Sequence, residues 1–162
     1  MKRYTQWGVV AVAAGVVIAV GCVSTLAQDK MALVKERQDL MDQQGDDQKV
    51  INAYITGTGE QAAAVAKAQD LIAIAGKIGN ARLWPAGTAI ADLPVKATRA
   101  KPEIWQQMDK FLAHAATLKS EEEKLLAALQ KGDKDAAKVA FGDVGKNGCG
   151  ACHGTFRGPE IK

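Results

Sequence analysis

Hydrophobic residues recur every three, four or seven positions from Asp29 onward, which is the period expected for one face of an α-helix. The pattern predicts four helices, at residues 29–56, 60–78, 102–132 and 133–157. No segment alternates with a period of two, and no internal repeat interrupts the pattern. Because the turns after the first and third helices are short, neighbouring helices should run antiparallel. The sequence therefore predicts an all-α fold, an up-down-up-down four-helix bundle.

The connection between the second and third predicted helices is unusually long. It spans residues 80–101 and contains Pro85, Gly87 and Pro94. Loops of this length within a compact domain are uncommon and tend to be functional. In an alternating bundle this loop lies at the same end as the start of the first helix and the end of the fourth, so we expect a site there. The charged stretch 119–124, "KSEEEK", is instead predicted to be a hydrated helix face.

The first residues differ from the rest of the chain. Lys2 and Arg3 precede a long, uncharged and largely apolar run, which is typical of a secretory signal peptide. Small residues favour cleavage after Ala27, so we expect residues 1–27 to be removed and residues 28–162 to form the mature bundle. The expected location is the periplasm.

Two alternatives remain for the N-terminus. Cys22 follows a sequence that resembles a lipoprotein cleavage box, and cleavage there would leave a lipid anchor on that cysteine. A retained membrane helix is the other alternative, although the apolar run falls short of the ~20 residues that a span normally needs.

The charge of the chain excludes one class of partner. The formal net charge is +3 at pH 7, and removal of Lys2 and Arg3 with the signal peptide lowers it. Proteins that bind nucleic acid through the phosphate backbone normally carry a strongly basic patch. We therefore expect no nucleic-acid partner.

Two cysteines and a histidine close to the C-terminus carry the strongest chemical signal. Cys149, Cys152 and His153 form the Cys-X-X-Cys-His pattern of covalent haem c attachment. On a helix the two thiols reach one porphyrin edge, while the following imidazole projects to the iron. A zinc site would need two more ligands, and in the expected mature chain only His114 is another candidate of that type. A redox dithiol normally follows a strand, and a plain disulfide would leave His153 unused.

The predicted haem needs a residue on the other side of the iron. Arg37 and Met41 lie four apart on the first helix and so share a face. Methionine is a good sixth ligand to haem iron, but it also fills irregular cores, and both interpretations stay open. To meet His153, the first helix must extend beyond the rest of the bundle.

Other residues at this end are candidates for contact with the haem. Arg157 lies four residues after His153 and pairs with a propionate or, alternatively, remains solvated near the helix C-terminus. Trp84 and Trp105 are expected to pack on the porphyrin or to fill the core. His114 is more often a satisfied or exposed histidine than a ligand.

Four segments resemble the class II cytochromes c, the family of cytochrome c′ and its low-spin relatives. They are "ERQDLM" (36–41), "LWPAGT" (83–88), "KPEIW" (101–105) and "AFGDVGKNGCGACHGTFR" (140–157). The resemblance implies a periplasmic four-helix bundle with one covalent haem near the C-terminus. Gly150 and Gly154 depart from the charged or bulkier residues often found there in the family.

The resemblance also implies two functions. Cytochrome c′ proper has a five-coordinate iron that binds nitric oxide or carbon monoxide, whereas the low-spin relatives use a helix-one methionine as sixth ligand and carry electrons. Met41 occupies that position, four after the arginine at Arg37, and the chain resembles the low-spin branch more closely. We therefore expect a single-electron carrier that serves periplasmic redox proteins. A peroxidase is disfavoured because no distal acid–base pair is recognisable. The family often forms homodimers, and the sequence leaves monomer or homodimer open.

Overall fold

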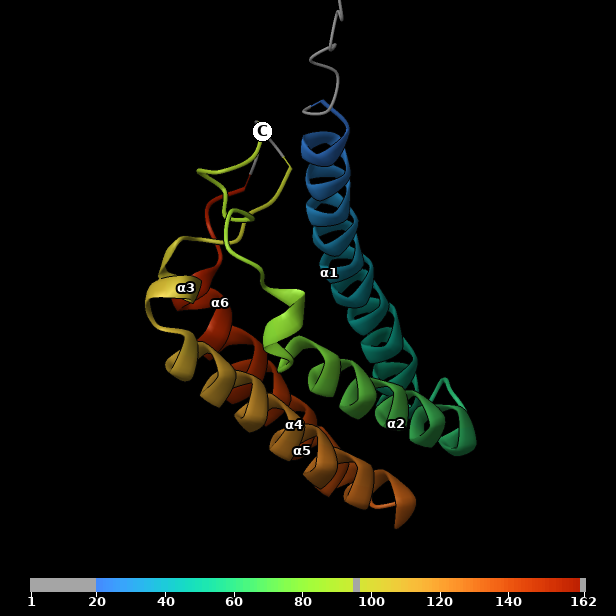
Figure 1. Ribbon diagram of the computed structural model, residues 1–162. Helices are drawn as coiled ribbons and strands as arrows, with labels where there is room; N and C mark the ends of the chain where they lie inside the picture. Colours follow the sequence, from blue (N-terminus) through green and yellow to red (C-terminus); the bar gives the residue numbers. More distant parts are fainter. Residues whose placement is uncertain (1–19, 95–96, 161–162) are drawn as a thin grey trace, which may run out of the picture.

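The computed structural model describes residues 20–94 and 97–160, so most of the expected signal peptide lies outside the described residues. It confirms the all-α four-helix bundle (Figure 1). The long helices are α1 (Val20–Ile55), α2 (Gln61–Ile78), α4 (Met108–Gln130) and α5 (Lys134–Asp143). Shorter elements are η1 (Ala81–Leu83), α3 (Glu103–Gln106), η2 (Val144–Gly150) and α6 (Ala151–Phe156).

The third predicted helix is interrupted, which the sequence pattern did not indicate. α3 and α4 are separated by Gln107, whose φ of −131° and ψ of 45° are not helical. Ile104 is buried, and the Trp105 indole donates hydrogen bonds to the carbonyls of Trp84 and Pro85. These contacts with the preceding loop fix α3 in a direction that α4 does not share.

The fourth predicted helix also has an irregular centre. Asp133 caps it at the N-terminus, where its side chain accepts a hydrogen bond from the Ala136 amide. After α5 the chain widens into the π-helical segment η2, where the Ala151 amide donates to the Lys146 carbonyl five residues earlier. π-Helical turns often mark functional sites, and this one contains Cys149.

The wider turn also changes which residues face inward. Gly145, which the helical period places on the inner face, is exposed, whereas Gly148 is buried against α4. A Cβ at Gly148 would lie 2.6 Å from Leu118 Cδ1 and 3.3 Å from Leu118 Cα. The close approach of η2 to α4 therefore favours glycine at this position, since a larger residue would force Leu118 to move.

The hydrophobic core has two parts along the bundle. One lies toward the α1–α2 turn and includes Ile51, Leu71, Leu125 and Leu129. The other lies toward the long loop and is rich in aromatic side chains; its buried members are Leu40, Ile74, Ile78, Leu83, Trp84, Ile104, Phe111, Ala115 and Phe156. α1 extends past α2 at this second end and stands apart from α6 there (Figure 1). The extension that the sequence required of the first helix is present.

The loop after η1 returns to the end of α6 and is held there by backbone hydrogen bonds. Ala100 and Arg157 form an isolated antiparallel bridge. The Lys101 amide donates to the Phe156 carbonyl at 3.0 Å, and the Gly158 amide donates to the Arg99 carbonyl at 2.7 Å. The loop is thus fixed against the segment that carries the Cys-X-X-Cys-His residues.

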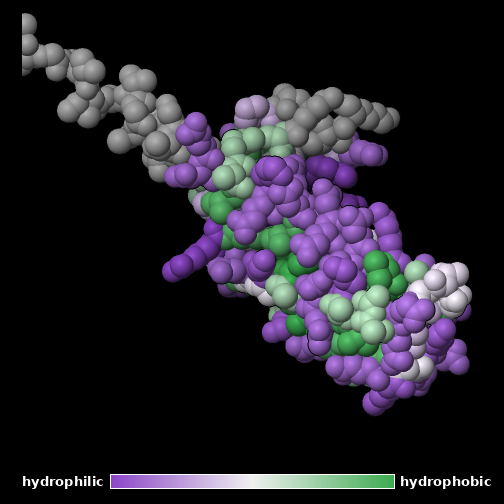
Figure 2. All heavy atoms as spheres, turned by 90° about the vertical axis from the view of Figure 1, so that its right-hand side faces the viewer, coloured by the Kyte–Doolittle hydropathy of each residue, from purple (hydrophilic) through white to green (hydrophobic). Residues whose placement is uncertain are grey.

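The face of the molecule on the α1 side is mostly hydrophilic, with hydrophobic side chains gathered in separate patches (Figure 2). Within residues 20–94 and 97–160, none of the helices combines the length and the hydropathy that crossing a membrane requires.

The prediction of a hydrated "KSEEEK" face is wrong for two of its residues. Glu121 and Glu122 on α4 are both buried, and Glu122 is 0% exposed. The helical period explains this, since Glu122 lies four residues after Leu118 and three before Leu125, which are both buried.

Candidate functional site

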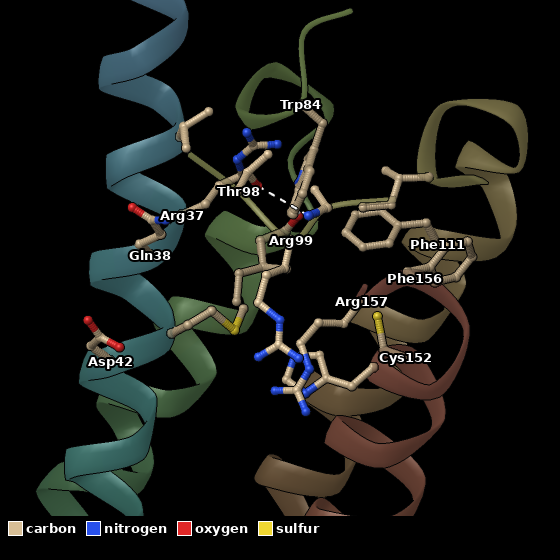
Figure 3. A pocket seen from close by; sticks show the side chains of 16 residues that line it. Arg37, Gln38, Asp42, Trp84, Thr98, Arg99, Phe111, Cys152, Phe156 and Arg157 are labelled. Carbon is tan, nitrogen blue, oxygen red and sulfur yellow. Dashed lines mark hydrogen bonds between the residues drawn. The ribbon is translucent and has the colours of Figure 1, made fainter. Parts of the chain in front are cut away.

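A cavity of about 300 Å³ lies between α1 and α6, at the end of the bundle where the sequence predicted a site. α1 contributes Arg37 and Met41 to its walls, and α6 contributes Cys152 and His153. Figure 3 shows Arg37 reaching in from α1 and Cys152 from the opposite helix. The structure therefore brings together residues that are more than 100 positions apart in the sequence.

The two cysteines are free thiols on adjacent turns. Burial, with a smaller effect of the Cys149 charge, raises the pKa of Cys152 to about 11. Burial also raises the pKa of Cys149, and the nearby Glu122 carboxylate adds to this. Redox-active dithiols have lowered pKa values, so these thiols do not fit that chemistry.

His153 is half-buried and lines the cavity. Burial lowers the pKa of its imidazole, and the positive charges of Arg157 and Arg99 lower it further. The neutral imidazole is the form that ligates a metal ion. Among the described residues, no group of three or more histidine, cysteine, aspartate or glutamate side chains is arranged to hold a metal ion.

Arg37 is a buried cation without an anionic partner among the described residues. Its side chain is 5% exposed, and burial lowers the pKa of its guanidinium to about 10. Nη2 donates to the Thr88 carbonyl at 3.2 Å, and the guanidinium lies 4.5 Å from the centre of the Trp84 ring. Nη1 has no acceptor within the described part of the chain. A buried cation is stabilised by an anionic partner, so we expect a bound group in the cavity to carry a carboxylate.

Met41 is half-buried and lines the cavity together with His153. Its side chain also packs against the aromatic part of the core. This position is compatible both with an axial ligand and with an apolar side chain that covers the iron. Its role stays a prediction.

An aromatic wall supports the cavity. The Trp84 and Phe111 rings are 4.6 Å apart, and Phe111 and Phe156 are 5.4 Å apart, each pair packed edge to face. All three rings line the cavity, whereas Trp105 does not. The Trp105 ring instead packs edge-on against Trp84, with centres 6.4 Å apart, so its contact with the cavity is indirect. His114 packs on Phe156 and also lies outside the lining.

Two arginines line the side of the cavity that carries His153. Arg157 is exposed, and Figure 3 shows it on the same side as Arg99. Arg99 donates from Nε and Nη2 to the Gly158 carbonyl at 3.0 and 2.8 Å. The spacing along the sequence pointed to Arg157 but not to Arg99, because only the fold places residues 97–101 beside α6.

These residues fit a covalently bound haem. The cavity is lined mainly by apolar and aromatic side chains, which suit a porphyrin face. Cys149 and Cys152 are free thiols available for two thioether bonds, and the lowered pKa of His153 favours its neutral imidazole. The unsatisfied Nη1 of Arg37 matches the negative charge of a propionate.

Comparison with known proteins shows what the chain is similar to. The family model described as cytochrome C′ matches residues 32–157. A cytochrome c′ of Alcaligenes xylosoxydans xylosoxydans is 41% identical over 58 residues, which cover 36% of this chain and 45% of that protein. The cytochrome c-556 of Agrobacterium fabrum is 30% identical over 137 residues, covering 85% of this chain and 88% of that protein. The aligned part spans only 45% to 62% of the first three curated relatives.

Solved structures agree with the fold. A cytochrome c′ with ligand-controlled dimer dissociation has a TM-score of 0.71 and 30% identity, covering 80% of this chain and 97% of that chain. A nitric oxide complex of a mutant cytochrome c prime from Alcaligenes xylosoxidans has a TM-score of 0.65 and 26% identity, covering 78% of this chain and 94% of that chain. The chain therefore belongs to the cytochrome c′ family of class II cytochromes c, and its cofactor is a haem c attached through Cys149 and Cys152.

Proposed function

We propose that this protein is a periplasmic haem protein that binds nitric oxide or carbon monoxide at its iron. The observation that carries the proposal is the cavity shared by His153 and the α1 residues Arg37 and Met41. The comparisons support gas binding more than the electron carrier preferred from sequence, because relatives are named cytochrome c′ and one was solved with nitric oxide.

Each residue at the site has a separate role toward the haem. When bound, the haem supplies an iron that takes axial ligands and exchanges single electrons. Cys149 and Cys152 would hold the haem through thioether bonds, and His153 would bind its iron. Arg37 would neutralise a propionate, and Arg157 places positive charge near His153. Met41, which lines the same cavity, would cover the iron.

A second candidate is a single-electron carrier in which Met41 is the sixth ligand. It is favoured by one observation, the position of the Met41 side chain in the same cavity as His153. Methionine–histidine ligation is an established arrangement for haem electron carriers. Redox proteins in the periplasm would then be its partners in electron transfer.

The two candidates are separated by the visible spectrum of the haem-bearing protein and by its reaction with nitric oxide. Gas binding predicts a high-spin spectrum, prompt nitric oxide binding and little change in Met41→Leu. A methionine-to-iron charge-transfer band that disappears in Met41→Leu would instead establish the carrier. Met108→Leu is the matched control, since Met108 is half-buried in the same core but outside the cavity.

We also propose a cleaved N-terminus and a homodimeric state for this protein. We expect secretion with cleavage after Ala27, and intact mass of the secreted protein separates this from a lipid on Cys22. One relative is a dimer whose dissociation depends on a ligand. A homodimer is therefore proposed for this chain, and sedimentation with and without carbon monoxide tests it.

A further inference from the structure

Glu122 is a buried carboxyl that has no role in gas binding or in electron transfer as proposed above. It lies on α4 with a side chain that is 0% exposed. Gln44 of α1 donates from Nε2 to Glu122 Oε1 at 3.1 Å. The second oxygen, Oε2, is buried without a partner in the described residues. A carboxylate held this way is strongly destabilised unless it takes up a proton.

The charged groups on the packed helices are engaged elsewhere. On α1 and α2, Asp47 and Lys67 pair with each other at 3.0 Å. On α4, Glu121 accepts from Lys124 at 2.9 Å. The Asp143 side chain, at the end of α5, accepts from Asn147. No cation within residues 28–94 and 97–160 forms an ion pair with Glu122, so its charge state depends on its own surroundings.

Glu122 lies beside one of the two points of haem attachment. Its negative charge contributes, after burial, to the raised pKa of the Cys149 thiol, which requires the two groups to be close. Cys149 follows Gly148, whose backbone meets Leu118 one turn before Glu122 on α4. Cys149 also packs against the core cluster that contains Leu118 and Leu125. Once Cys149 is a thioether, Glu122 remains as a buried titratable group beside this attachment point.

We propose that Glu122 is a proton-binding site coupled to the haem, which takes up a proton when the iron is reduced and releases it when the iron is oxidised. The inference rests on the haem of the proposed function but not on the choice between gas binding and electron transfer. One electron comes from a one-electron reductant and one proton from the solvent. The only bond made or broken on the protein is the O–H bond of Glu122.

The coupling has an electrostatic cause. Burial raises the pKa of Glu122 to about 8, opposed by the hydrogen bond from Gln44, so its proton is exchangeable near neutral pH. Oxidation adds one positive charge to the haem, and a positive charge nearby favours the carboxylate. The affinity of Glu122 for its proton is therefore higher in the reduced protein.

The test is the midpoint potential of the haem-bearing protein as a function of pH. The wild type should show a potential that falls as pH rises around pH 8 and is flat on both sides. A tenfold difference in proton affinity between oxidation states gives a total fall of about 59 mV. Glu122→Gln should remove the fall, while Glu123→Gln, an exposed neighbour on the same helix, should keep it. A fall that persists in Glu122→Gln overturns the inference.

A second variant keeps the inference testable if Glu122→Gln does not fold. Gln44→Met removes the hydrogen bond that lowers the Glu122 pKa, so the pH range of the fall should move upward. The infrared difference spectrum between oxidised and reduced protein should show a protonated carboxyl band that is lost in Glu122→Gln. Absence of that band from the wild type overturns the inference even if haem is attached. A chain with no covalent haem would overturn the proposed function instead.

Discussion

The Arg37 guanidinium lies 4.5 Å from the centre of the Trp84 ring and donates a hydrogen bond to the Thr88 carbonyl. Thr88 is 0% exposed and itself donates to the Pro85 carbonyl at 2.8 Å. The loop after α2 is thereby attached to α1 at the wall of the cavity. This arrangement holds a positive charge among apolar side chains, where it can pair with an anionic group.

Replacement of Arg37 by glutamine should lower the midpoint potential of the haem-bearing protein. Removal of a positive charge near the iron favours the oxidised state. The free energy of unfolding should also fall by about 1–2 kcal/mol, because the contacts with Trp84 and Thr88 are lost. Redox titration and chemical denaturation measure the two effects. Arg82→Gln, at an exposed position of η1, is the control, and an equal change in both variants would contradict the role of Arg37.

Replacement of Gly148 by alanine should destabilise the protein by about 1–3 kcal/mol. The new Cβ would meet Leu118 at a distance that neither backbone accommodates without moving. Gly142→Ala is the matched control, since a Cβ there meets nothing within 4 Å. That control should be stabilising by roughly 0.5–1 kcal/mol, as expected for glycine to alanine in a helix. Denaturation curves showing equal stability for the two variants would refute the close approach of η2 to α4.

Stability should depend on pH through Glu122. Its pKa is raised from 4.5 to about 8 in the folded state, so the folded protein binds the proton more tightly than the unfolded chain. The contribution is fully present below pH 4.5 and is lost as pH rises through 8, at a slope of up to about 1.4 kcal/mol per pH unit. Denaturation at several pH values should show this decline in the wild type. It should be weaker in Glu122→Gln and unchanged in Glu123→Gln.

The two cysteines should contribute separately to haem attachment. Cys149→Ala and Cys152→Ala should each retain haem by one thioether, whereas the double variant should lose all covalent haem. Mass spectrometry under denaturing conditions distinguishes these outcomes. Haem that remains covalently bound in the double variant would exclude attachment through these thiols.

Several features of the molecule follow from local sequence signals. The helical period predicted the four-helix bundle, and the Asp133 cap is present because capping depends on neighbouring residues alone. The Cys-X-X-Cys-His pattern indicated the haem, since attachment chemistry requires that spacing within one helical stretch. The comparisons support the family and cofactor. The roles of Met41, Arg37, Arg157 and Trp105 stay predictions.

Other features depend on contacts that no local pattern contains. The break at Gln107 arises because Trp105 bonds to a loop about 20 residues away, and the π-helical turn arises where Gly148 meets Leu118. Glu122 belongs to a charged run that is typical of a solvated face. The helical period places it among buried neighbours on α4, but only the packing of α1 against α4 brings Gln44, 78 residues away, to its carboxyl. Sequence determined which residues form helices and which carry the haem chemistry. Tertiary packing decided which charges are buried, because burial is set by elements that are distant in the chain.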